Sequence, residues 1–161
     1  MDSSSSWSSN SRWIRDVFIN FRPQDNSNTF VSHITHAFTK AGINAFIDDQ
    51  LHMGTELEPE LLRTIEKSRL SILVFSKNYT ESSWCLKELQ KIIECRRNLG
   101  QRVVSVFYDV YLSVVRHQNG SFGKKLKATA KRICFNSRTR KREMLTSWKS
   151  ALKEAAGFCV S

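Results

Sequence analysis

Four short apolar segments, separated by stretches with helical periodicity, constrain the fold of this chain most. They run over residues 15–21, 43–48, 70–76 and 103–108, and their apolar side chains are nearly continuous. Strands covered on both faces of a parallel sheet have this composition, whereas strands with one wet face alternate. We therefore predict a parallel sheet buried between helices.

The intervening stretches predict the covering helices. The first apolar stripe at helical spacing ends at Gly42, a residue typical of helix C-termini. In the second stretch, Thr55 and Glu58 fit a capping box, and Pro59 is a residue that prefers the first helical position.

Further helices are expected around residues 85–93 and near residues 121–134 and 142–156. The alternation of strands and helices predicts an α/β fold with a doubly wound parallel sheet and right-handed crossovers. We expect a short fifth strand, whose position the pattern does not fix.

The length of 161 residues and the 40% hydrophobic content suit one ordinary core. Residues 1–13 are a serine-rich leader without an apolar region of signal-peptide type, so we expect a disordered leader followed by one domain over residues 14–161. No stretch approaches the roughly 18 continuous apolar residues of a membrane span. We expect a cytoplasmic protein, with the nucleus as a second location, and no membrane partner.

The four cysteines are scattered, at Cys85, Cys95, Cys134 and Cys159, with no C-x-x-C pair and no adjacent histidine cluster. This spacing does not indicate a metal site, and we expect reduced thiols that pack as small apolar side chains.

The formal charge of +10 is concentrated in one region. From Val110 to Arg142 there are ten Lys or Arg residues and no Asp or Glu, while the remaining basic and acidic residues cancel. Such a region suits nucleic acid, acidic lipid or an acidic partner, but it also suits a face that is merely solvated.

In an open α/β sheet, ligands bind outside the carboxyl ends of the strands. A helix that begins near Ser82 follows the loop of the third strand and carries Trp84 and Glu88 one turn apart. Glu88 falls at the border of the apolar stripe, beside the indole, where partial desolvation raises a carboxyl pKa and suits acid–base or electrostatic catalysis. The alternative is an ordinary surface glutamate paired with Lys91 at i+3.

Several segments together identify a family. "DVFINFRPQD", "GINAFIDDQLHMG", "PELLRTIEKSRLSILVFSKNY", "SSWCLKEL", "VFYDV" and "GSFGK" follow the order and spacing of the plant Toll/interleukin-1 receptor (TIR) domain. The resemblance runs from about Arg15 to the C-terminus. It implies a flavodoxin-like sheet of about five strands, in a TIR-only protein or in the TIR domain of an immune receptor.

The resemblance also implies an activity. Plant TIR domains are NAD+ nucleosidases, which cleave the nicotinamide–ribose bond, and the essential glutamate of their "WCLxEL" motif matches Glu88. Trp84 and Ser82 match positions in the nucleotide pocket of the family. NAD+ or NADP+ is then a substrate, with no cofactor and no metal, and the products signal in plant innate immunity and hypersensitive cell death.

Self-association is a further implication of the resemblance. "FVSH", with Ser32 and His33, matches a surface that pairs copies of the domain or joins it to other TIR proteins. The loop that contains Asp48, Asp49, Met53 and Gly54 matches one that meets the pocket of a neighbouring subunit.

The sequence departs from the family in the loops that face the nucleotide. Pro23 replaces a glycine, and Ser27 and Met53 stand where the family commonly has arginines, so Arg22 is the remaining candidate for a phosphate-binding cation. Two alternatives therefore stay open. The chain could be a non-catalytic adaptor that acts through TIR–TIR contacts, or a TIR protein whose basic region binds or processes nucleic acid.

Overall fold

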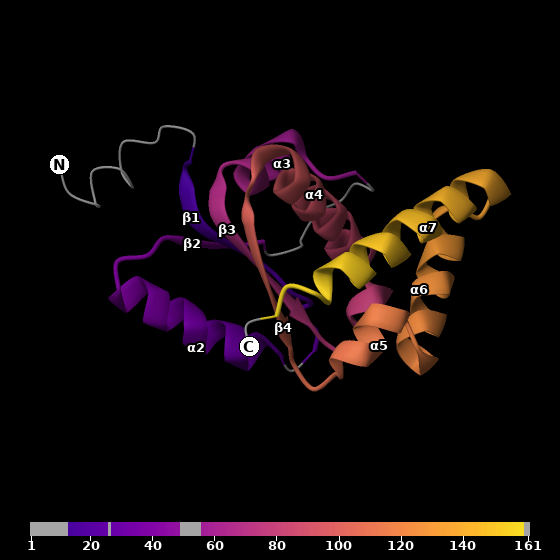
Figure 1. Ribbon diagram of the computed structural model, residues 1–161, viewed down its shortest axis with the longest axis horizontal. Helices are drawn as coiled ribbons and strands as arrows, with labels where there is room; N and C mark the ends of the chain where they lie inside the picture. Colours follow the sequence, from indigo (N-terminus) through magenta and orange to yellow (C-terminus); the bar gives the residue numbers. More distant parts are fainter. Residues whose placement is uncertain (1–12, 26, 49–55, 160–161) are drawn as a thin grey trace.

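The computed structural model describes residues 13–25, 27–48 and 56–159, so nearly all of the predicted leader lies outside it. Within these ranges four parallel strands form one sheet in the order β2-β1-β3-β4 (Figure 1). The strands are β1 (Arg15–Asn20), β2 (Ala45–Ile47), β3 (Ser68–Phe75) and β4 (Arg102–Phe107). The four predicted segments are therefore the four strands. A single parallel bridge between Ser105 and Cys159 marks where a fifth strand would pair.

The helices follow the predicted alternation, with two differences. They are α2 (Ser27–Lys40), α3 (Pro59–Glu66), α4 (Ser83–Leu99), α5 (Leu112–His117), α6 (Gly120–Ile133) and α7 (Arg138–Ala155), with a short 3-10 helix η1 (Tyr79–Glu81). Helix α5 was not predicted. Helix α7 begins four residues early because Ser137 Oγ accepts a hydrogen bond from the amide of Arg140 and so caps the helix there.

The capping box predicted for α3 is wrong. Glu58 is itself the N-cap residue and makes no side-chain cap, and Pro59 occupies the first helical position, where its missing N–H costs nothing. At the other helix ends, the glycine terminus expected at Gly42 is present, and a second one, which was not predicted, occurs at Gly100. Gly42 follows α2 with φ of 76°, and Gly100 ends α4 with φ of 67°, a left-handed conformation that favours glycine.

Helices cover both faces of the sheet. On one face, α3, α4, α6 and α7 pack on side chains such as Phe18, Leu73 and Phe75, and Trp148 and Leu152 of α7 are fully buried there. On the other face, α2 covers Val17, Ile19 and Val74 (Figure 1). The carboxyl ends of the strands, the N-terminus of α4 and helix α5 share one edge of the domain. The predicted doubly wound architecture is confirmed.

Gln101 joins α3 to β3 at the opposite edge of the sheet. Its side-chain amide donates hydrogen bonds to the carbonyl oxygens of Ile65 and Ser68, at 2.6 and 2.7 Å, and its Oε1 accepts one from Ser71 Oγ at 3.1 Å. The side chain is 2% exposed. Gln101 therefore satisfies buried polar groups that the helix and strand ends leave open.

Candidate active site

The candidate site lies where β1, β2 and α4 meet. Asn20 is the last residue of β1, Asp48 directly follows β2, and Trp84 and Glu88 lie on the first two turns of α4. Parallel strands end at a common edge, so residues far apart in the sequence converge there. Glu88 and Asn20 are both 0% exposed, and Asp48 is 5% exposed.

Two neutral groups fix the Glu88 carboxyl. Asn20 Nδ2 donates to Glu88 Oε1 at 2.8 Å and to the carbonyl oxygen of Cys85 at 3.2 Å. The hydroxyl of Tyr79 in turn donates to Asn20 Oδ1, which sets the orientation of the amide. Glu88 Oε2 is buried without a hydrogen bond to the described residues. The carboxyl is thus held on one side and unsatisfied on the other.

A second carboxylate faces Glu88. Trp84 Nε1 donates to Asp48 Oδ2 at 2.7 Å, which ties the indole to the end of β2. Burial, and after it the neighbouring Asp48 carboxylate, raises the pKa of Glu88 well above its usual range, against the lowering effect of Asn20 and Trp84. Glu88 therefore favours its neutral form in this closed arrangement.

The structure corrects two expectations about Glu88. It is completely buried rather than partly desolvated, because the ends of β1 and β2 cover the border of the helical stripe. It is also not a surface glutamate paired with Lys91, whose ammonium contacts Glu66 at 2.8 Å and Glu94 at 3.4 Å. A buried glutamate with no cationic partner among the described residues is costly, which makes a purely structural role for it unfavourable.

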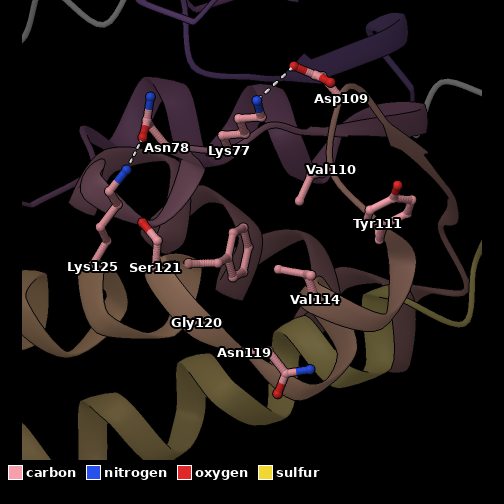
Figure 2. Close-up of a pocket in the computed structure, with 11 residues that line it drawn as sticks. Lys77, Asn78, Asp109, Val110, Tyr111, Val114, Asn119, Gly120, Ser121 and Lys125 are labelled. Carbon is pink, nitrogen blue, oxygen red and sulfur yellow. Dashed lines mark hydrogen bonds and ion pairs between the residues drawn. The ribbon is translucent and has the colours of Figure 1, made fainter.

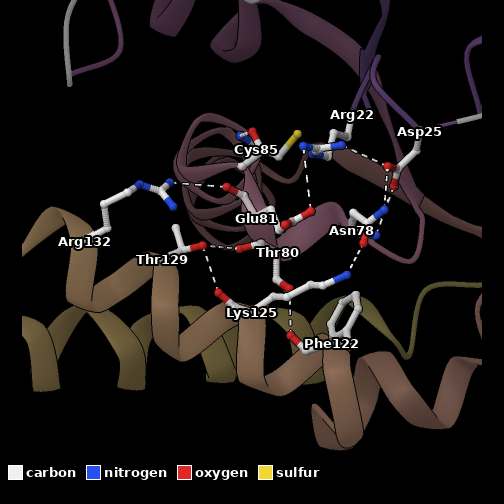
Figure 3. Close-up of polar contacts among 11 residues, drawn as sticks. Arg22, Asp25, Asn78, Thr80, Glu81, Cys85, Phe122, Lys125, Thr129 and Arg132 are labelled. Atoms are coloured by element: carbon white, nitrogen blue, oxygen red, sulfur yellow. Dashed lines mark hydrogen bonds and ion pairs between the residues drawn. The ribbon is translucent and has the colours of Figure 1, made fainter.

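Ser82 and Arg22, two of the predicted substrate-binding residues, already have partners. Ser82 is the N-cap of α4, and its Oγ accepts a hydrogen bond from the amide of Cys85 at 3.0 Å. Arg22 contacts Asp25 at 2.9 Å and Glu81 at 3.8 Å, and Figure 3 shows its guanidinium between these two carboxylates. A phosphate at Arg22 would share the cation with them, so substrate binding by Ser82 and Arg22 stays a prediction.

The Arg22 contacts extend to α6. Asp25 accepts hydrogen bonds from the amide of Asn78 at 3.0 Å and from its side chain at 3.2 Å, and Lys125 donates to Asn78 Oδ1 (Figure 3). The loop after β1 is thereby fixed to the helical half of the domain rather than left open above the sheet.

The structure describes only some of the other predicted positions. Asp49, Met53 and Gly54 lie outside the described residues. Ser32 and His33 are exposed on α2, as predicted for a surface of self-association, although that role itself is a prediction. Ala37 of the same helix is exposed as well.

Sequence reasoning missed Asn20 and Tyr79, the two residues that orient Glu88. Asn20 had a usable signal, because it is the polar residue of the otherwise apolar run "VFINF". No sequence signal pointed to Tyr79. A tyrosine after a strand is an ordinary core residue, and Asn20, which accepts the hydrogen bond from its hydroxyl, belongs to another strand.

A separate hollow of about 730 Å³ lies on the α5 and α6 side of this edge (Figure 2). Lys77 and Asp109 form an ion pair of 3.3 Å at its rim, and Phe122 and the exposed Tyr111 line it. Glu88, Asp48 and Trp84 do not line this hollow. In residues 13–25, 27–48 and 56–159, no group of three or more His, Cys, Asp or Glu side chains is placed to hold a metal ion.

Comparison with known proteins identifies the family. The family described as "TIR domain" matches residues 15–161. The chain belongs to the TIR domain family. This TIR domain is 45% identical over 146 residues to Disease resistance protein TAO1 of Arabidopsis thaliana, covering 91% of this chain and 12% of that protein. It is 42% identical over 152 residues to TMV resistance protein N of Nicotiana glutinosa, covering 94% and 13% respectively.

Its fold is similar to a solved TIR structure described as "Structure of the activated Roq1 resistosome directly recognizing the pathogen effector XopQ (TIR domains)". The TM-score is 0.78 at 38% identity, over 91% of this chain and 86% of that one. The chain spans about an eighth of the length of the two curated relatives. None of the described helices is long and apolar enough to cross a membrane.

Proposed function

We propose that this TIR domain acts in plant immune signalling by hydrolysing the nicotinamide–ribose bond of NAD+ or NADP+, with Glu88 as the catalytic carboxyl. The immune role is supported by relatives that are named as disease and virus resistance proteins and by the similarity to the TIR domains of a resistosome. The hydrolase activity rests on the resemblance of the "WCLKEL" segment and on the chemistry of the buried carboxyl.

The observation that carries the proposal is the Glu88 carboxyl itself. It is 0% exposed, has a raised pKa, faces Asp48 and retains one oxygen without a hydrogen bond in the described structure. Perturbed, buried acids at the carboxyl ends of parallel strands are frequent at functional sites. A fold that needed only a core side chain here would be more stable with an apolar residue.

The reaction suits one carboxylate. NAD+ and water give nicotinamide, ADP-ribose and a proton: the bond from ribose C1 to the ring nitrogen breaks with its electron pair going to nicotinamide, and water supplies the oxygen at C1. Nicotinamide leaves neutral and needs no general acid. An ionised Glu88 would stabilise the cationic ribosyl group or hold a ribose hydroxyl, as carboxylates do in glycosidases.

The partners of Glu88 have supporting roles in this proposal. Asn20 orients Oε1, so that Oε2 is the oxygen left for the ribose. Trp84 supplies an apolar wall that shields the cationic state from water. The positive charge of the substrate favours the ionised form of Glu88, which opposes the effect of burial and of Asp48 on its pKa.

Self-association is part of the proposal. Because Glu88 is closed to solvent, substrate reaches it only after the site rearranges, and contact between TIR domains is the proposed cause. Ser32 and His33 are available on the exposed face of α2 for such a contact. The presence of TIR domains in the activated Roq1 assembly supports this arrangement by analogy.

The test is nicotinamide release from NAD+, measured over a wide range of protein concentration. Glu88→Gln keeps the shape and the Asn20 hydrogen bond but removes the charge, and should lower the rate at least about 100-fold. Glu94→Gln, on the exposed side of the same helix, is the matched control and should retain activity.

Two outcomes contradict the hydrolase proposal. Equal turnover by wild type and Glu88→Gln would remove Glu88 from the mechanism. No turnover by folded wild-type protein, even when concentrated, would favour the non-catalytic adaptor, a reading that the occupied Arg22 and the closed Glu88 support.

A further inference from the structure

The tip of the α6–α7 hairpin combines an exposed aromatic ring with a cluster of cations. We call this surface the basic tip: Phe135 together with Lys131, Arg138, Arg140 and Lys141. Residues 131–142 contain six Lys or Arg and no Asp or Glu. Figure 1 shows the turn between α6 and α7 at the far right of the molecule, away from the sheet.

Phe135 is 82% exposed although the turn around it is well ordered by contacts. The amide of Cys134 donates a hydrogen bond to the carbonyl oxygen of Ala130 at 2.9 Å. The amide of Ser137 donates one to the carbonyl oxygen of Cys134 at 3.3 Å. Cys134 itself is buried, with its Sγ 3.7 Å from Met144 Sδ. The buried Cys134 therefore anchors the turn, and the hydrogen-bonded backbone directs the ring of Phe135 outward.

Three of the four cations lie at a helix end that does not favour positive charge, whereas Lys131 lies in the last turn of α6, where a cation is favourable. Arg138, Arg140 and Lys141 occupy the first turn of α7, whose N-terminus carries partial positive charge and no acidic residue. None of the four cations of the basic tip makes an ion pair with a carboxylate of the described residues. These charges lower the stability of the isolated domain, and an anionic surface that approaches them would offset this loss.

We propose that the basic tip docks this domain peripherally on an anionic membrane surface. On a lipid interface, Phe135 would enter the boundary between headgroups and acyl chains while the cations remain at the phosphates. A convex tip with one protruding ring suits a fluid, flat surface. The bases of duplex nucleic acid are stacked inside the helix and offer the ring no partner, so lipid accounts for both features of the tip.

This proposal is independent of the hydrolase activity and revises the expectation of no membrane partner. That expectation considered spanning segments, whereas a peripheral contact needs none. It also narrows the interpretation of the region from Val110 to Arg142, because its C-terminal part, residues 131–142, combines cations with an exposed aromatic ring at a protruding end.

The test is sedimentation of the full chain with vesicles of phosphatidylcholine alone or with about 30 mol% phosphatidylserine. Wild type should bind the anionic vesicles and not the neutral ones. Phe135→Ala should weaken binding at least about 10-fold, from the apolar area it removes. Tyr111→Ala, which truncates an equally exposed aromatic outside the tip, is the matched control and should leave binding unchanged.

Arg138→Gln with Arg140→Gln should weaken binding by about 30-fold, at roughly a fivefold loss for each cation. Lys40→Gln with Lys153→Gln removes the same charge from exposed positions elsewhere and should have a much smaller effect. Because the tip cations oppose the dipole of α7, the first pair should leave the melting temperature unchanged or raise it, which separates lost binding from unfolding.

Phe135→Trp tests insertion directly when its tryptophan fluorescence is measured with vesicles of brominated lipids. Bromine should quench the fluorescence of this variant more than that of the wild-type protein. Three results would overturn the proposal: no binding to anionic vesicles at low salt, equal effects of Phe135→Ala and Tyr111→Ala, or Phe135-dependent binding to single-stranded nucleic acid that exceeds binding to the vesicles.

Discussion

Glu88→Gln should stabilise this domain, and the gain should grow with pH. The carboxyl is 0% exposed, and burial together with Asp48 raises its pKa well above the usual range. A group whose folded-state pKa is raised contributes its full stability below the unfolded pKa, about 4.3 for glutamate, and loses it as pH rises toward the folded pKa. Over that window the stability of wild type falls with pH relative to that of the uncharged variant.

The magnitude follows from the contacts. Glutamine retains the acceptor for Asn20 Nδ2, and its amide supplies a donor for Asp48 at every pH, which the carboxyl supplies only while it is protonated. Removing a buried unsatisfied group is worth about 1–3 kcal/mol. At about 2–4 °C per kcal/mol for a domain of this size, the melting temperature should rise by about 2–12 °C near neutral pH.

Urea unfolding, followed through tryptophan emission, to which the fully buried Trp148 contributes, measures the difference at about pH 4.5, 5.5 and 7. Glu94→Gln, an exposed glutamate on the same helix, should change stability by less than about 0.5 kcal/mol at each pH. The reasoning fails if Glu88→Gln gives the same difference at all three values, or if it destabilises the domain at neutral pH.

Three further predictions use other parts of the structure. Asp48→Asn should move the acidic limb of the pH–rate profile of nicotinamide release to lower pH, because the Asp48 carboxylate raises the pKa of Glu88; an unmoved limb would separate the two groups. Gln101→Met should destabilise the domain by about 2–4 kcal/mol in urea unfolding, since two carbonyl oxygens and a hydroxyl lose their buried partner; a loss below about 1 kcal/mol would show that water replaces it. His33→Ala should flatten the rise of specific activity with protein concentration while changing stability by less than about 0.5 kcal/mol; identical concentration curves would exclude this face from the active assembly.

The strands were predictable because their signal is local. Continuous apolar runs bounded by polar residues identify buried parallel strands without knowledge of their neighbours, and all four predicted runs are strands. Helix α5 was not predictable in the same way. It has six residues, too few for a repeated apolar stripe, and no side chain caps its N-terminus, so its sequence resembles that of a loop.

The candidate site was predictable as a location but not as a geometry. The helical wheel placed Glu88 at a border, and only the packing of β1 and β2 against α4 decides that a border residue is fully enclosed. The partners of Glu88 come from positions 68 and 40 residues away, at Asn20 and Asp48, and no periodicity links such positions. Ser82 shows a limit of motif matching. Its match to the family suggested a contact with the ligand, whereas in the structure its hydroxyl caps helix α4.

The burial of Glu88 links ionisation to access, and this link gives the proposed self-association a physical role. Each unit by which the pKa of Glu88 exceeds the working pH lowers the ionised fraction about tenfold, so the closed arrangement would limit the proposed activity. A contact between domains that admits water or substrate to Glu88 removes part of the desolvation that raises this pKa. We therefore expect the acidic limb of the rate profile to move to lower pH as the protein concentration rises, together with the rise in specific activity. If assembly only aligned substrate, the rate would rise with the limb fixed, so the position of the limb at low and high concentration distinguishes opening of the site from positioning alone.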